Sequence, residues 1–283
     1  MFEDQFCNDP TCDRVREGEQ HLKHDLSRAI EKRSKSLADL ISDGFRFAGV
    51  TTGAGLGFVF GGPAGAIVGA GLGTSIELIG DEIGKRFLAK RERERVGYII
   101  IRACDKIKQN MDNGMKLRPD DFFDDNQGDR SAAKEIVEGI LIAAQKEYQE
   151  KKLPFYSNLL ANIAFHPEID RGQANLLIRS AERLSYRQLC ILSLVSQKSR
   201  FNLRQQEYRT VGAIEGPLAM LLIEVFDLIS QLMLNIPGVA VLGVAEIDPS
   251  KLNAQGTGSF LFDLMELRDI DYNELKEIAL ILS

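Results

Sequence analysis

The sequence has few of the residues on which covalent scaffolds depend, with four cysteines among 283 residues. Four cysteines are too few for a disulfide framework in a chain of this length. Cys104 and Cys190 fall on apolar faces of predicted helices, where packing in the core is the ordinary role of a cysteine. The composition therefore excludes a small disulfide-bonded secreted scaffold and favours a protein with an ordinary hydrophobic core.

Histidine is also scarce, and two of the three histidines lie near the remaining cysteines. Cys7, Cys12, His21 and His24 supply ligand types that bind zinc tetrahedrally. Their spacing is irregular, however, because fewer residues separate Cys12 from His21 than small zinc fingers place between their ligand pairs. We therefore favour a solvated N-terminal segment over a zinc site.

Motifs for catalysis and for cofactor binding are missing as well. The chain has no G-x-S-x-G elbow, P-loop, dinucleotide fingerprint or H-E-x-x-H pair. His166 precedes Pro167 at a predicted helix end, where capping is the simpler role, and the sequence does not show whether Glu135 and Glu138 meet it. We therefore predict that the protein is not an enzyme and that it uses no cofactor.

An acidic stretch from Pro119 to Asp129 interrupts the helical pattern after Asn113-Gly114. Its aspartates do not fit a calcium loop of the EF-hand type, because glycine falls at the wrong place. We expect a flexible acidic loop that Phe122 and Phe123 attach to the core.

Charge is absent from the thirty residues between Phe47 and Ile76. Within this stretch glycine recurs at every fourth position, at Gly49, Gly53, Gly57, Gly61, Gly65, Gly69 and Gly73. Each glycine in a helix interior costs about 1 kcal/mol relative to alanine, so close backbone contact must offset the penalty. In lipid, this small-xxx-small pattern is how helices associate.

A break at Gly62 and Pro63 predicts a helical hairpin, with arms of about Phe47–Phe60 and Ala64–Gly80. Each arm is shorter than the roughly 20 apolar residues that a spanning helix needs. One kinked span, a shallow re-entrant hairpin, insertion after oligomerisation and a hairpin buried in a water-soluble protein all remain open. Basic residues flank the stretch and suit an anionic membrane surface: Arg46, Lys85, Arg86, Lys90 and Arg91.

Periodicity divides the chain into four predicted parts. These are an N-terminal amphipathic helix in 1–46, the glycine-zipper hairpin in 47–80, a helical bundle in 81–200 and a C-terminal module in 201–283. The expected fold is mainly α, with a glycine-rich helical hairpin and a small α+β module at the end.

Local signals place the helices of the predicted bundle. Ser131 is expected to cap a helix that runs to about Lys151, and Pro154 to open another that ends near His166-Pro167. A third helix is expected over Arg171–Leu184. The sequence Ser185-Tyr186-Arg187-Gln188 is typical of a capping box for a fourth.

The last part changes character. A helix is expected from about Pro217 to Leu234, followed by the β-branched run Val239–Val244, and a final helix over about Asp271–Leu282. Helices with a short hairpin in this order resemble a winged-helix module, although no basic recognition helix accompanies them.

The run from Lys151 to Asn162, continued by Ala174-Asn175 and by Leu184 to Leu189, resembles segments of uncharacterised bacterial proteins, some of them carried on mobile elements. Such proteins pair a helical block with a winged-helix-like tail. The glycine column separately resembles the glycine-zipper segments of membrane-associated bacterial proteins and pore-forming toxins. Neither resemblance supplies catalytic residues.

Two functions follow as hypotheses. The first is a membrane-active effector that resides in the cytoplasm and associates with the inner membrane when active. It would act as a homo-oligomer, with membrane lipid and a protein regulator as partners. An antiphage or toxin role is an analogy only. The alternative is a soluble interaction or regulatory protein whose tail binds a protein partner or DNA. The net charge of −6 weighs against nucleic acid, although several arginines lie near the tail: Arg183, Arg187, Arg200, Arg204 and Arg209.

Overall fold

The computed structural model describes residues 90–124, 131–210 and 212–283. The predicted N-terminal helix and the predicted glycine-zipper hairpin lie outside these residues. The described part is mainly helical, with eight α-helices in the described ranges and a small antiparallel sheet near the C-terminus. The prediction of a mainly α helical bundle is therefore confirmed.

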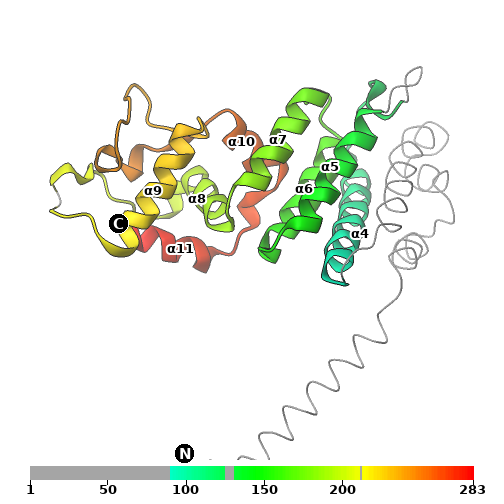
Figure 1. Ribbon diagram of the computed structural model, residues 1–283. Helices are drawn as coiled ribbons and strands as arrows, with labels where there is room; N and C mark the ends of the chain where they lie inside the picture. The colour runs from blue at the N-terminus through cyan, green and yellow to red at the C-terminus, as the bar shows by residue number, and fades with distance from the viewer. Residues whose placement is uncertain (1–89, 125–130, 211) are drawn as a thin grey trace, which may run out of the picture.

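The first four described helices lie side by side (Figure 1). They are α4 (Lys90–Asp112), α5 (Ala132–Lys146), α6 (Leu153–Ile163) and α7 (Arg171–Arg183). Helix α4 packs against α5 and α6, and α5 packs against α6 and α7. Apolar residues recur at three- and four-residue intervals along α4 and α5, and those residues, Val96, Ile99, Ile136 and Ile140 among them, are fully buried.

Most of these helices begin at the predicted signals. The Ser131 hydroxyl accepts a hydrogen bond from the Lys134 N–H at 3.3 Å and caps α5. Pro154 stands in the first turn of α6, where its missing N–H costs nothing. Ser185 and Gln188 form the expected capping box at the start of the next helix, α8. Signals within four residues were therefore sufficient to predict where these helices start.

Helix α5 ends at Lys146, earlier than the predicted end near Lys151. Glu147 leaves the helical conformation with a ψ of 117°, and its carboxylate accepts a hydrogen bond from the Gln149 N–H at 2.8 Å. Residues 147–149 and the short 3₁₀ helix η2 (Glu150–Lys152) then lead into α6. The prediction of a helix to Lys151 was wrong. The Glu147 carboxylate binds the Gln149 N–H, which in a continued helix would donate to a backbone carbonyl.

The remaining helices are α8 (Tyr186–Ser196), α9 (Gly216–Ser230), α10 (Thr257–Leu264) and α11 (Tyr272–Ile281). Helix α8 packs against α9, α10 and α11, and α10 also packs against α6 and α7. Buried apolar residues form a continuous cluster from α4 to α11. The core therefore continues across residue 200, where we placed a domain boundary.

Two strands of two residues each form the sheet. Strand β1 (Leu234–Asn235) pairs antiparallel with β2 (Asn253–Ala254), so that Leu234 lies opposite Ala254. Further short 3₁₀ helices are η1 (Asp121–Phe123), η3 (Lys198–Arg200), η4 (Tyr208–Thr210), η5 (Val244–Glu246), η6 (Pro249–Lys251) and η7 (Leu267–Asp269).

The β-branched run Val239–Val244 is not part of this sheet. An isolated bridge joins Ile236 to Val239 around Pro237-Gly238, and the chain then follows the surface, where 82% of Leu242 is exposed. Leu234, by contrast, is fully buried. Burial of one apolar side chain, rather than β-propensity of the run, thus decides where the strand lies.

The segment after α4 is held by Arg118. Gly114 adopts a φ of +87° just after the helix, as glycine readily does. The Arg118 guanidinium then binds the Asp120 carboxylate with two hydrogen bonds of 2.6 and 2.7 Å and lies over the Phe122 ring. Phe122 and Phe123 are both buried. The prediction that these two aromatic residues attach the loop to the core is confirmed.

Among the described residues, no helix is both long enough and apolar enough to cross a membrane.

Candidate functional site

Most of the residues predicted to contact a membrane precede the described part of the chain. They are the seven zipper glycines at positions 49, 53, 57, 61, 65, 69 and 73, the turn at Gly62 and Pro63, and the basic residues Arg46, Lys85 and Arg86. The weak zinc set of Cys7, Cys12, His21 and His24 also lies outside the described residues. All of these assignments stay predictions.

The described chain begins at the end of the predicted basic flank, with Lys90 and Arg91 in the first turn of α4. Arg91 lies 3.7 Å from the Glu150 carboxylate, and Arg95, one turn later, lies 3.5 Å from it. Arg95 also donates a 3.0 Å hydrogen bond to the carbonyl of Gln145, at the end of α5. Only 15% of the Arg95 side chain is exposed. The first described turns of α4 are therefore tied to the end of α5 and to the connection between α5 and α6.

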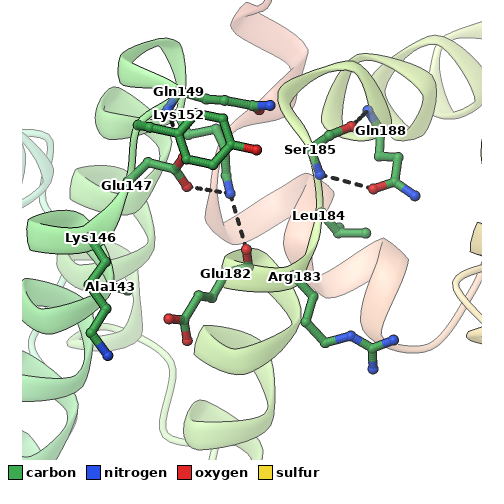
Figure 2. Close-up of a pocket in the computed structure, with 11 residues that line it drawn as sticks. Ala143, Lys146, Glu147, Gln149, Lys152, Glu182, Arg183, Leu184, Ser185 and Gln188 are labelled. Atoms are coloured by element: carbon green, nitrogen blue, oxygen red, sulfur yellow. Dashed lines mark hydrogen bonds and ion pairs between the residues drawn. The ribbon is translucent and has the colours of Figure 1, made fainter.

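This connection, residues Glu147–Lys152, borders a cavity of about 280 Å³ (Figure 2). The cavity lies between the end of α5, the end of α7 and the start of α8. Figure 2 shows the Lys152 ammonium between the Glu147 carboxylate and the Glu182 carbonyl, with Lys146 and Arg183 on helices to either side. We take this cavity, with the ion pair that borders it, as the first candidate site.

The centre of the site is a buried ion pair. Lys152 Nζ lies 2.5 Å from Glu147 Oε2, and 2% and 6% of the two side chains are exposed. The same ammonium donates to the Glu182 carbonyl at 3.4 Å, and the single O–H of Tyr156 has two acceptors within reach, Glu147 Oε2 and the Ala181 carbonyl, both at 3.3 Å. Buried charges are stable only when partners of this kind surround them.

Burial raises the pKa of the Tyr156 hydroxyl, and the neighbouring Glu147 carboxylate raises it further. Both effects disfavour a second negative charge in this small volume. The Tyr156 hydroxyl therefore stays protonated at physiological pH and remains a hydrogen-bond donor for the Glu147 carboxylate.

The connection also contacts the C-terminal helices. The Gln149 side-chain carbonyl accepts a 2.5 Å hydrogen bond from the Tyr186 N–H, the first amide of α8. Lys151 Nζ binds the Glu274 carboxylate of α11 at 3.0 Å and lies over the Tyr186 ring. Successive side chains of one short connection therefore bind α4, α7, α8 and α11.

Sequence analysis did not identify this cluster. Lys151 and Lys152 adjoin a helix start marked by Pro154, where charged side chains are ordinarily solvated. The only available signal was the apolar run after Lys152, which places a lysine at the edge of a buried segment.

A second cavity, of about 540 Å³, lies between α4 and α6 on one side and η7 and α11 on the other. Its walls carry opposite charges that pair across it. Lys106 on α4 binds Glu266 at 2.8 Å, and Asn162 on α6 donates to Glu266 at 3.2 Å and to the Leu264 carbonyl at 2.9 Å. These contacts join the first helices to the C-terminal part.

The residues considered for catalysis are engaged separately. Glu135 binds Arg171 and Asn175, and His166 Nδ1 lies 2.6 Å from Glu168. Within the described ranges, no group of three histidine, cysteine, aspartate or glutamate side chains is placed to hold a metal ion.

Two of the five arginines considered for DNA binding are paired with carboxylates. Arg187 binds Glu224 through two nitrogens, and Arg209 binds Glu246 at 2.7 Å. Arg200 and Arg204 lie over the Tyr272 and Tyr208 rings, whereas Arg183 is exposed at the rim of the first cavity. A carboxylate already bound to an arginine competes with a phosphate for it.

Comparison of the chain with protein-family models, curated proteins and solved structures gave no match.

Proposed function

We propose that the protein is a membrane-active bacterial effector that forms pores or disrupts membranes. The helical bundle and the winged-helix-like tail hold a glycine-zipper hairpin in 47–80 away from lipid until an activating event releases it. One observation carries the proposal: thirty consecutive residues without charge, in which seven glycines recur at every fourth position. The helix-propensity cost of these glycines is offset where two backbones pack closely, and helices in lipid associate through such contacts.

The described helices support the proposal through the anchoring of α4. The described part of α4 begins at Lys90, shortly after the proposed hairpin in sequence, and Arg91 and Arg95 pair with Glu150 of the bundle. A segment that is stored on a soluble scaffold and then released requires such a fixed point. Because each arm is short for a bilayer, we infer that insertion is coupled to homo-oligomerisation.

Leakage of dye from anionic liposomes tests the proposal. In a Gly57→Leu/Gly69→Leu variant the bulky side chains would separate the backbones, so we expect leakage to be abolished while helicity is unchanged. The matched control is Ala54→Leu/Ala66→Leu, which adds the same bulk within the same stretch but outside the glycine column, and this variant should still cause leakage. Equal leakage from both variants would overturn the mechanism.

A cellular experiment complements this assay. Overexpression should dissipate the membrane potential and kill the host, and active protein should resist extraction from inner membranes by high salt and carbonate. An antiphage or toxin role is compatible with this behaviour and rests on analogy alone.

The runner-up function is a soluble interaction or regulatory protein. Exposed apolar residues in the C-terminal part favour a protein partner over DNA: Met220 and Ile223 on α9, and Val239 and Leu242 in the following loop. Protein found wholly in the cytosol of cells in which it is active would support this function and exclude the first.

A further inference from the structure

The connection Glu147–Lys152 has more roles than joining α5 to α6. We propose that it is a coupling junction, through which the position of the C-terminal helices α8 and α11 controls how firmly the start of α4 is held. The consequence for the hairpin before α4 rests on the proposed function, whereas the coupling itself does not.

On one side the junction holds α4. The Glu150 carboxylate lies 3.5 Å from the largely buried Arg95, which also reaches the Gln145 carbonyl beside it, and 3.7 Å from Arg91, whose exposed side chain adds little to the hold. That carbonyl belongs to the last turn of α5, where intrahelical donors are lacking. Movement of Glu150 therefore removes the carboxylate from both arginines at once and leaves the partly buried Arg95 with a single neutral acceptor.

On the other side the junction holds the C-terminal helices. The Tyr186 N–H opens α8, where it has no acceptor within its own helix, and Gln149 supplies one at 2.5 Å. Lys151 pairs with Glu274 on α11 at 3.0 Å. Gln149, Glu150 and Lys151 are consecutive residues, so a displacement of α8 or α11 reaches Glu150 through one or two peptide units.

The base of the junction makes this link stiff. The Lys152–Glu147 pair, with Tyr156 and the Glu182 carbonyl around it, is almost wholly buried, so the loss of one partner leaves a charge with little solvent to replace it. Packed polar clusters of this kind exchange between discrete arrangements rather than deforming gradually. The junction can therefore switch the hold on α4, and under the proposed function loss of that hold is the step that frees the hairpin.

Amide hydrogen exchange of the full-length protein, read over residues 94–100, tests the coupling. The informative variant is Gln149→Leu, because the Gln149 side chain accepts a hydrogen bond from α8, whereas Arg91 and Arg95 bind Glu150 and the Gln145 carbonyl. We expect exchange in the first described turns of α4 to rise by up to roughly fivefold, because the lost hydrogen bond lies at the start of α8 and a fivefold rise would require all of its free energy to reach α4. Lys151→Ala should act in the same direction. Gln149→Glu keeps an acceptor at the α8 start and should leave exchange at the wild-type level.

Arg187→Gln serves as the control for general loosening of α8, since it removes the ion pair to Glu224 without touching the junction. Circular dichroism and thermal unfolding establish that each variant is folded. Faster exchange that is confined to residues around 149 and 186, with α4 unchanged, would overturn the coupling, as would an equal rise in α4 for Arg187→Gln. If exchange in α4 rises as expected but no variant causes liposome leakage, the coupling stands and the membrane function fails.

Discussion

Lys152 Nζ lies 2.5 Å from Glu147 Oε2 in the interior of the protein, across the connection between α5 and α6. The two residues are five positions apart in sequence, a spacing that does not make them neighbours on one helix face, so the pair forms only because α5 ends at Lys146. The ion pair and the break in the helix depend on each other.

Lys152→Met should destabilise the protein by about 3–5 kcal/mol, because the Glu147 carboxylate would remain buried without its cation. Urea unfolding measures this loss. The double variant Lys152→Met/Glu147→Leu removes both charges and should recover part of the stability. If the double variant is destabilised by the sum of the two single effects, the pair is not the coupled unit described above.

Gly258→Ala should cost about 2–3 kcal/mol, since overpacking against rigid atoms is costly. A Cβ atom at Gly258 in α10 would lie 2.3 Å from the Met233 carbonyl oxygen, which is backbone and cannot move aside. Gly139→Ala in α5 is the matched control, because there the nearest atom is the Ile178 Cδ1 methyl at 3.4 Å. Thermal unfolding should show the control at or above wild-type stability, owing to the helix propensity of alanine. Similar losses in both variants would contradict the proposed clash.

Acid should weaken the hold of Arg118 on the loop after α4. Hydrogen bonds from Arg118 lower the pKa of Asp120 below its ordinary value of 3.8. A lowered folded-state pKa contributes stability that is complete above the ordinary value and is lost as the pH falls through the lowered one. Asp120→Asn should therefore be less stable than wild type near neutral pH, and the difference should vanish in strong acid.

Urea titrations at a series of pH values measure that difference. Because Asp120 is partly exposed, solvent screens the interaction and the effect should be smaller than for Lys152. A difference that stays constant down to the lowest pH would show that Asp120 acts through its shape and not its charge.

Two cysteines should resist thiol reagents in the folded protein. Burial raises the pKa of Cys104 to about 12 and that of Cys190 to about 11, and the Asp105 charge adds to the effect at Cys104. The thiolate is the reactive form, so little of it exists at pH 8. In a Cys7→Ser/Cys12→Ser variant, iodoacetamide should modify both remaining thiols only when urea unfolds the chain. Fast modification without urea would show that these helices open readily.

Local signals in the sequence were sufficient for much of the fold. The hydroxyls of Ser131 and Ser185 cap helices at the predicted positions, Pro154 lies in the first turn of a helix, and Phe122 is buried as expected. These features depend on neighbours within about four residues, so the sequence displays them directly.

The two wrong predictions have different causes. Helix α5 ends where the Glu147 carboxylate accepts a hydrogen bond from the nearby Gln149 N–H. The strand, by contrast, lies at Leu234, and not at Val239–Val244, because Leu234 pairs with the distant Ala254.

By itself, the amino-acid sequence determined the helical periodicity, the helix starts and the position of the glycine column, which lies outside the described residues. Only the tertiary structure decided that Lys152 is buried against Glu147, that Glu150 holds Arg95, and that Gln149 caps α8. The reason is the range of the forces. A helix cap is satisfied within one turn, whereas a buried charge is stable only where separate helices bring its partners together.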